Sequence, residues 1–457
     1  MIGMMAIYPL VERFEFDEDE GIELMKGRLL ADGHSLYAEV WDDQPPVLSA
    51  AFAGIYRLAG ASVTASRFLV LAISALLLLS WQAVSMRLGG RGLALATLGI
   101  VITQPFYLKL SLSAMAGLPA VALASAALAC QIRWHQDRSR LALAASGGLI
   151  ALAILTKLFL VILLPVLFVG IVLADLRNRR RQMRNLSLWL VTGAGVGGLI
   201  AVAWLAPEAW EQLVAPHASA RQVEAYQDEP WLRGFDASWA LISLAAAGAV
   251  QRLRRRQWLW LYPTVWTVIA LVMLLGHRPV WYHQRLLVLV PAAILAASAL
   301  VEALRWIRPG APLRRLATSL LVIAAVGVMA GQHLPPLRAF VMRGDSATEA
   351  RRLQDRIVVD LREQAAPGSW VVTDRPIYAF RADLAVPPPV AVITAKRRVT
   401  GRLDEDVVLA AIDDYRIDVV LLARFDWSEL PERPVDGWQP TRYGERSVLY
   451  VRKETGQ

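Results

Sequence analysis

The chain has 457 residues, of which 56% are hydrophobic and 19% charged, and its mean hydropathy is +0.42. This composition is too apolar for an ordinary soluble domain and indicates a protein that crosses the membrane several times. The net charge of +9 could suggest nucleic acid, but residues 333–457 carry 19 basic and 19 acidic side chains. The basic excess therefore lies in the apolar part, where it indicates membrane topology and argues against a nucleic-acid-binding face.

Ten apolar segments, free or nearly free of charge, are candidates for membrane-spanning helices, which need about 20 residues, or fewer beside polar cavities. They are residues 64–86, 92–108, 114–131, 141–156, 158–174, 187–205, 237–250, 258–275, 286–301 and 316–332. Some connections between them are basic, namely Arg87 with Arg91 and residues 133–140, 177–184, 252–256 and 305–315. The others are acidic or aromatic, chiefly residues 12–46, with eleven carboxylates against three basic side chains, and residues 207–235. By the positive-inside rule the basic connections face the cytoplasm, whereas the acidic loops and the tail after residue 332 face outward.

The start of the chain does not fit this alternation. Residues 1–10 are too few to span a bilayer, and they lack the basic start and the cleavage site of a signal peptide. We therefore expect a further membrane helix upstream, which would bring the total to 10–11, with an interfacial position of residues 1–12 as the alternative. Residues 47–60 would break the alternation if they spanned, so we expect an amphipathic helix on the outer interface.

The tail has a different sequence pattern from the apolar part of the chain. Its pattern predicts a helix at 345–364, a strand at 369–374, a helix at 404–414, a strand at 418–425 and two closing strands at 439–443 and 446–452. The fold class expected is mainly α: a polytopic helical membrane bundle over residues 1–332, with a catalytic first loop at 12–46. A small extracytoplasmic α/β domain is expected over residues 333–457.

Four consecutive carboxylates, residues 17–20, stand near the start of the outward loop. One interpretation is a capping box, with Asp17 at the N-cap of a helix and Glu20 three positions later. It explains one or two carboxylates, but not the others or the continuation of the loop to Asp42 and Asp43. Carboxylates gathered where a membrane bundle meets water suit a different task, which is to deprotonate an acceptor hydroxyl or to hold a cation.

The stretch FDEDEG…GRLLADGHSLYAEVWDDQPPVLSAAFAGIYRLAG, residues 16–60, resembles the first extracytoplasmic loop of GT-C glycosyltransferases that use polyprenyl-phosphate sugars. Protein O-mannosyltransferases and the lipid A aminoarabinose transferase belong to this group. The shared pattern is an Asp-Glu pair, then Gly and Tyr, then an acidic-x-Pro-Pro element before a juxtamembrane helix. The stretches LTKLF (155–159), HRPVWYHQRLLVLVP (277–291) and WVVTDRPIYAFRADLAVPPP (370–389) are similar to later parts of the group, the last to the tail domain of bacterial members.

The resemblance implies an inverting transfer of a sugar from a polyprenyl-phosphate donor to a lipid, glycan or protein acceptor, outside the inner or plasma membrane. Carried over, Asp19 is the general base, and Asp17 with Glu18 is the rival register. Glu20 and Asp43 would shape the acceptor site or a site for a divalent cation, and the loop tyrosine, Tyr37, would contact substrate.

A lipid phosphate that leaves with negative charge needs cationic partners at the membrane surface. The candidates are Lys157, His283 and Arg285, with Tyr282 and Trp281 as lipid or sugar contacts. A basic side chain at a helix end can instead snorkel, and Trp281 fits an interfacial aromatic belt better.

Two positions depart from the group. Gln44 stands where some relatives have Lys, which leaves a phosphate contact there in doubt, and residues 108–119 lack an acidic side chain often found there, with Lys109 as their only charge. Other classes remain as alternatives: a transporter or flippase for a lipid-linked or acidic solute, which would favour inverted repeats and ionisable groups near the midplane, and a scaffold whose tail binds glycan.

Overall fold

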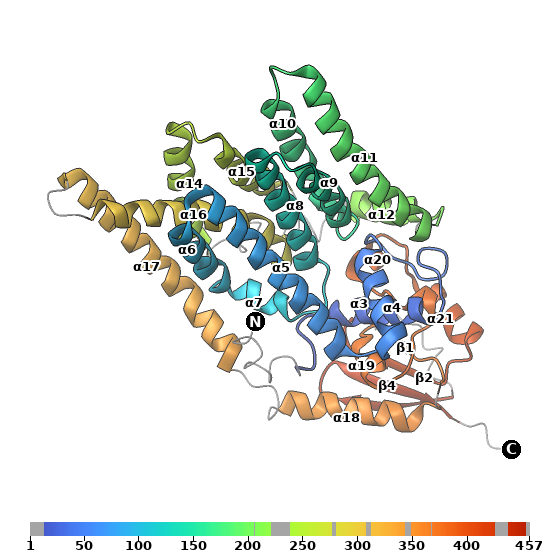
Figure 1. Ribbon diagram of the computed structural model, residues 1–457. Coiled ribbons are helices and arrows are strands. Elements are labelled where there is room, and N and C mark those ends of the chain that lie inside the picture. The colour runs from blue at the N-terminus through green and yellow to red at the C-terminus, as the bar shows by residue number, and fades with distance from the viewer. Residues whose placement is uncertain are drawn as a thin grey trace.

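The computed structural model describes residues 13–204, 206–220, 238–276, 280–307, 312–342, 349–366, 368–425 and 437–453. A helical bundle makes up most of the molecule, and a smaller α/β unit lies at one end of it (Figure 1). Residues 1–12, to which the expectation of an interfacial segment or an upstream helix applies, lie outside the described residues.

Each of the ten segments predicted to span the membrane coincides with helical structure. Six helical stretches are long and apolar enough to cross a membrane: α5 (Val63–Gly89), α8 (Gly117–Asp137), α11 (Arg179–Trp204), η4 with α15 (Trp258–Trp260, Leu261–Leu275), η5 with α16 (Tyr282–Arg285, Leu286–Trp306) and α17 (Leu313–Met342). The other four segments form shorter helices: α6 (Arg91–Ile102), α9 (Arg140–Ile154), η1 with α10 (Leu158–Leu163, Leu164–Ala174) and α14 (Trp239–Arg254). The chain is therefore an integral membrane protein.

Helices α6 and α17 both end away from the expected residue. The predicted span 92–108 is divided, because α6 ends at Ile102 and a short helix, α7 (Pro105–Ser111), follows. Proline has no N–H to continue a helical ladder but suits the first turn of a new helix, and the Thr103 hydroxyl donates to carbonyl groups in the last turn of α6. Helix α17 continues to Met342, past the expected end at residue 332.

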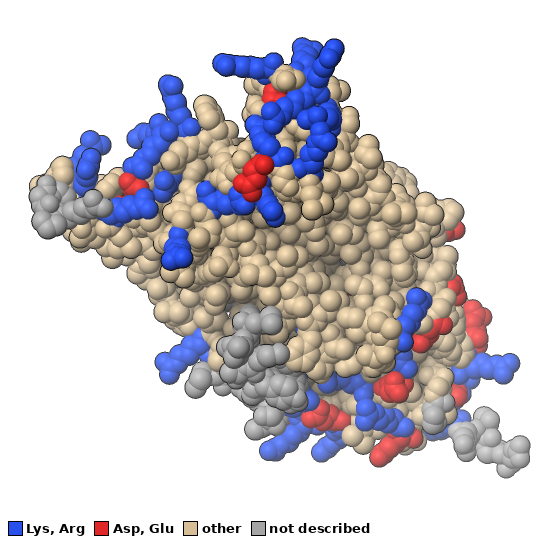
Figure 2. Space-filling view, in the orientation of Figure 1, with Lys and Arg blue, Asp and Glu red and all other residues tan. Residues whose placement is uncertain are grey.

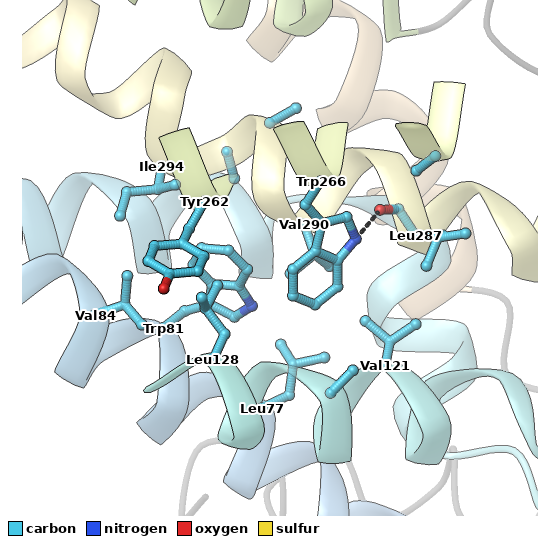
Figure 3. Close-up of a cluster of buried hydrophobic side chains, with 14 of the residues drawn as sticks. Leu77, Trp81, Val84, Val121, Leu128, Tyr262, Trp266, Leu287, Val290 and Ile294 are labelled. Atoms are coloured by element: carbon cyan, nitrogen blue, oxygen red, sulfur yellow. Dashed lines mark hydrogen bonds between the residues drawn. The ribbon is translucent and has the colours of Figure 1, made fainter. Parts of the chain in front are cut away.

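The bundle packs around α16, which is buried along nearly its whole length, whereas α11 and α17 expose most of their apolar surface. In the core the ring centroids of Trp81 and Trp266 lie 5.8 Å apart, among aliphatic side chains of α5, α8 and α16 (Figure 3). The indole N–H of Trp266 donates to the Leu287 carbonyl at 3.0 Å, and that of Trp81 donates to the Ser125 hydroxyl at 2.9 Å. Both buried indoles thus keep a hydrogen-bond partner.

The basic connections gather at one end of the bundle. Figure 2 shows Lys and Arg side chains along the upper edge of the molecule, above a broad band of uncharged surface. Ion pairs join neighbouring connections there: Arg87 with Asp137 (2.9 Å), Arg138 with Asp175 (3.4 Å) and Arg255 with Glu302 (2.6 Å). We expect this end to face the cytoplasm.

The other end carries the α/β unit. Its elements are α3 (Glu20–Ala31), α4 (Val47–Ala59), α12 (Ala209–Ala220), α18 (Glu349–Gln364), β1 (Val372–Thr373), α19 (Ile377–Arg381), η7 (Pro388–Val390), α20 (Ala395–Val399), α21 (Glu405–Asp414), β2 (Val419–Leu422), β3 (Trp438–Tyr443) and β4 (Ser447–Arg452). The sheet has the order β1-β2-β4-β3, with β1 parallel to β2 and the other pairs antiparallel. Every helix and strand named for the tail is confirmed, although β1 is short because Trp370 pairs with Ala385 instead.

The first loop and the tail share one hydrophobic core, separate from that of the bundle. Phe14 of the loop and Phe52 of α4 lie in the same buried cluster as Leu421 of the sheet. Helix α3 approaches α19 so closely that a Cβ on Gly21 would lie 2.4 Å from the Ile377 backbone nitrogen. The outward loop and the tail therefore form a single body, and the loop's shape depends on the tail.

The amphipathic helix predicted after the Pro-Pro pair is α4. Its buried face includes Leu48, Phe52 and Tyr56, whereas Leu58 is 90% exposed. This one-sided burial suits a helix that lies along an interface.

Candidate active site

The four consecutive carboxylates form the turn that leads into α3. The amide of Glu20 donates to the Asp17 carbonyl at 3.1 Å, and the amide of Asp19 donates to the Asp17 carboxylate at 3.0 Å. Asp19 is the N-cap residue of α3, and its side chain makes no capping hydrogen bond. The capping-box interpretation with Asp17 at the N-cap is therefore wrong, because the Glu20 carboxylate takes part in a buried ion pair.

That ion pair joins Glu20 to Arg67 of α5. The Arg67 guanidinium donates to Glu20 from Nε at 2.9 Å and from Nη2 at 2.8 Å, and both side chains are fully buried. Glu20 also accepts from the amides of Phe16 and Ala114, each at 2.9 Å. With four hydrogen bonds on two oxygens, Glu20 fastens the loop to α5 and to the segment before α8.

Asp17 is held by Tyr282 of η5. The Tyr282 hydroxyl donates to Asp17 Oδ2 at 2.7 Å, and the ring of Tyr282 lies 4.0 Å from Nζ of Lys109. The structure thus brings together Asp17 and Tyr282, two residues considered in the sequence analysis. The Lys109 ammonium of α7 lies over the Tyr282 ring, a favourable arrangement for a cation and an aromatic ring.

Asp19 and Glu18 face Arg424, which follows β2. Nη2 of Arg424 lies 2.7 Å from Asp19 Oδ1, and its Nε lies 3.0 Å from Glu18 Oε2. The side chain of Asp19 is 44% exposed, so one carboxylate oxygen is paired while water still reaches the group.

Lys157 lies in the turn between α9 and η1, outside the helices, and contacts His283 of η5. Their Nζ and Nε2 atoms are 3.2 Å apart. Burial lowers the pKa of Lys157, while the loop carboxylates Glu23, Asp43 and Asp19 act in the opposite direction. Lys157 therefore lies where the first loop meets the bundle.

A second cluster lies deeper in the loop, around Lys26. Its Nζ contacts Asp42 at 2.8 Å and Glu23 at 3.1 Å. Burial favours neutral Lys26, but Asp42 and Glu23 outweigh it and raise its pKa. Burial raises the pKa of Asp42 to about 7 against the opposing effect of Lys26, and Glu23 adds to the rise. One cation shared by two carboxylates leaves one of them easy to protonate.

Asp43 connects the first loop to α12 and to the tail. Its Oδ2 contacts Lys396 Nζ of α20 at 2.6 Å, and Lys396 lies 3.1 Å from Nδ1 of His217 on α12. Nε2 of His217 lies 3.1 Å from the Asp43 carbonyl oxygen. Although burial favours protonation of Asp43, the Lys396 ammonium holds its pKa well below the usual range.

The remaining predicted residues lie around this core. Tyr37 is buried at a φ of +70°, a left-handed conformation that is costly for a bulky residue, and its hydroxyl donates to the Gln44 carbonyl at 2.8 Å. The guanidinium of Arg285 lies 4.9 Å from the ring of Phe106, which also contacts the ring of Tyr282. Trp281 is 47% exposed, as expected for an interfacial side chain.

Similar folds occur among solved structures of membrane enzymes. ArnT from Cupriavidus metallidurans in the apo state matches with a TM-score of 0.64 at 16% identity, over 98% of this chain and 96% of that one. The same protein bound to undecaprenyl phosphate matches with a TM-score of 0.63 at 14% identity and the same coverage. An oligosaccharyltransferase from Archaeoglobus fulgidus tethered with an acceptor peptide matches with a TM-score of 0.56 at 14% identity, over 88% of this chain and 64% of that one. No protein-family model and no curated protein sequence matches the chain.

The chain has the GT-C fold. ArnT, an aminoarabinose transferase, and the oligosaccharyltransferase are both GT-C glycosyltransferases, so the resemblance read from the sequence is confirmed at the level of the fold. Within this fold the candidate residues come from the first loop, the turn after α9, η5 and the tail.

Sequence reasoning missed the basic partners of the loop. These are Arg67, Lys26, His217, Lys396 and Arg424. Arg67 carried a signal, because a lone arginine inside an apolar span is costly unless it is paired. The tail residues carried none, since nothing local marks Lys396 or Arg424 as a partner of a loop some 350 to 400 residues away.

An open cavity of about 410 Å³ adjoins the start of the first loop. It is lined by Phe14, Glu15, Phe16, Asp17 and Glu18 of the loop and by Ala350, Arg351 and Gln354 of α18. In the described parts of the chain, no group of three or more His, Cys, Asp or Glu side chains is arranged to hold a metal ion.

Proposed function

We propose that the protein is an integral-membrane glycosyltransferase that moves a sugar from a polyprenyl-phosphate donor to an acceptor on the extracytoplasmic face, with inversion. Support comes from the GT-C fold shared with ArnT, which has been solved with undecaprenyl phosphate, and with an oligosaccharyltransferase tethered to an acceptor peptide. The first loop supplies carboxylates, and the buried Lys157 ammonium lies where this loop meets the bundle. A base and a cation at one site favour the same chemistry.

The observation that carries the proposal is the difference among the four consecutive loop carboxylates. Glu20 has both oxygens filled and no exposed surface, and Asp17 accepts from Tyr282. Asp19 and Glu18 each pair with Arg424 through one oxygen, and their side chains are 44% and 50% exposed. Exposure therefore favours Asp19 and Glu18 as the group that takes the proton of an acceptor hydroxyl, and the resemblance of the loop to GT-C enzymes selects Asp19.

In the reaction the acceptor oxygen bonds to the anomeric carbon as the bond from that carbon to the phosphate oxygen breaks. The acceptor proton passes to Asp19, and the lipid phosphate leaves as an anion. Lys157 donates to the phosphate in place of its contact with His283, with Arg285 and the Tyr282 hydroxyl as further donors.

Other predicted residues act on the shape of the site. Glu20 positions the loop through Arg67, while Tyr37 and Asp43 keep the segment before the Pro-Pro pair in place through Gln44 and Lys396. The carboxylate-lined cavity offers acceptors for the hydroxyl groups of a sugar-bearing or hydroxyl-bearing acceptor.

The experiment is release of labelled sugar from a panel of polyprenyl-phosphate sugars by membranes that contain the protein. Asp19→Asn should lower the transfer rate about 10² to 10⁴-fold, the usual contribution of a general base. Glu211→Gln is a matched control, because Glu211 is an exposed carboxylate at the same end, paired with Arg402. Full activity of Asp19→Asn would move the base to Asp17, and no consumption of any donor by folded protein would overturn the glycosyltransferase proposal.

A further inference from the structure

Arg424 is the one residue of the tail in direct contact with Asp19 among the described residues. It donates from Nη2 to Asp19 and from Nε to Glu18, so its guanidinium spans two neighbouring carboxylates. Its side chain is only 12% exposed. A planar guanidinium held at two points fixes the orientation of the groups it binds.

The backbone that carries Arg424 is fixed by a buried carboxylate. Asp374, directly after β1, is fully buried and accepts from three successive amides: Ala423 at 2.8 Å, Arg424 at 3.1 Å and Phe425 at 2.9 Å. Because β1 and β2 are parallel, their carboxyl ends lie at the same edge of the sheet, where Asp374 can reach the residues after β2. The sheet thus aims Arg424 at the loop.

We propose that Arg424, held in place by Asp374, is a positioning residue that orients the Asp19 carboxylate for proton transfer. This inference rests on the proposed function of Asp19. It gives the tail a role in the reaction: the outer domain completes the site by supplying the cation beside the base. The free Asp19 oxygen then faces the acceptor, since Arg424 occupies the other.

The other charged and titratable groups around Asp19 do not replace Arg424. Asp17, Glu18 and Glu20 on the same loop carry negative charge, and Tyr282 is engaged with Asp17. Lys157 acts on Asp19 from a greater distance and contacts His283. Loss of Arg424 would leave Asp19 without the contact that fixes the orientation of its carboxylate.

The first measurement separates kcat from KM for sugar transfer. In Arg424→Gln, kcat should fall about 10 to 10²-fold while KM for the donor stays nearly unchanged, because Arg424 orients the base and does not bind substrate. Arg424→Lys keeps a charged donor and should recover part of the loss, whereas Arg402→Gln, which removes a tail arginine that contacts the exposed Glu211 instead, should leave kcat unchanged. An unchanged kcat in a folded Arg424→Gln protein overturns the inference.

The second measurement does not need activity. A double-mutant cycle of Asp19→Asn and Arg424→Gln on the unfolding temperature reports how strongly the two side chains are coupled. The double variant should lose less stability than the two single variants added together, because each single variant already breaks the contact. Additive losses in folded proteins overturn the inference, whereas coupled losses without transfer activity in the wild type would overturn the proposed function and leave the contact intact.

Discussion

The two ends of the molecule use ion pairs in different ways. At the basic end every pair named above has an exposed arginine: Arg87 and Asp137 are 30% and 43% exposed, and Arg138 and Arg255 are 38% and 43% exposed, although their partners Asp175 and Glu302 are buried. At the outer end the pair of Arg67 with Glu20 is fully buried, and that of Lys26 with Asp42 is 1% exposed on each side. The first end is rich in arginine, and the second is built from carboxylates that each have a partner.

This difference shows what each kind of charge does. Exposed pairs are screened by water and stabilise little, so a pair such as that of Arg87 with Asp137 constrains the fold only weakly. Buried pairs pay a large desolvation penalty, and removal of one partner leaves the other charge uncompensated. Buried pairs therefore constrain geometry, and they occur where the candidate site needs a fixed loop.

The largest effect is expected from breaking the buried pair. Glu20→Gln should lower the free energy of unfolding by about 3–5 kcal/mol, because Arg67 stays buried without a countercharge. Unfolding of the purified protein in detergent measures this. The double variant Glu20→Gln with Arg67→Met should regain most of the loss, and a double variant as unstable as the single one would show that the pair acts through something other than its charge.

A smaller effect concerns pH and the contact of His217 with Lys396. Nδ1 of His217 accepts from Lys396 and Nε2–H donates to the Asp43 carbonyl, so the ring is neutral in the fold. Burial and Lys396 lower the pKa of His217 in the folded protein. Below about pH 6.5, His217 therefore binds a proton more readily in the unfolded chain than in the fold. The free energy of unfolding consequently falls as the pH falls.

Glutamine at this position can accept and donate in the same way without titrating. Between pH 7 and pH 5 the unfolding temperature of wild type should therefore drop further than that of His217→Gln, by about 1–2 °C, a small amount because His217 is 37% exposed. His34→Gln, at an exposed pair with Glu39, is the control. Parallel curves for wild type and His217→Gln would contradict the neutral ring.

The smallest effect belongs to the basic end. Arg87→Gln removes the surface pair with Asp137 and should leave the unfolding temperature within about 1 °C of wild type, since exposed ion pairs contribute little. A loss comparable to that of Glu20→Gln would erase the distinction between the two ends.

Local patterns were enough to predict the elements of the fold. Apolar runs gave the helices of the bundle, and alternating residues gave the strands β2, β3 and β4, because hydrophobic length and period are local properties. Errors arose where one residue decided an end, as at Pro105, which divides the predicted span 92–108.

Pairing between distant segments could not be predicted in the same way. The loop was recognised by its carboxylates, but the partners Arg424 and Lys396 lie in the tail, and the Glu20 partner lies in a span judged almost free of charge. Such contacts depend on how the whole chain folds. They separate Glu20, fully buried, from Asp19, half-exposed, although the two residues are adjacent and chemically alike.

The shared core of the first loop and the tail has a consequence for biosynthesis. Tyr56 and Ile357 belong to one buried cluster, with about 300 residues between them. At a synthesis rate of roughly 5–20 residues per second, the loop emerges about 15–60 s before the segment that completes its core. The first loop and α4 are therefore made with their apolar face uncovered, and their core is complete only when the last quarter of the chain has been synthesised.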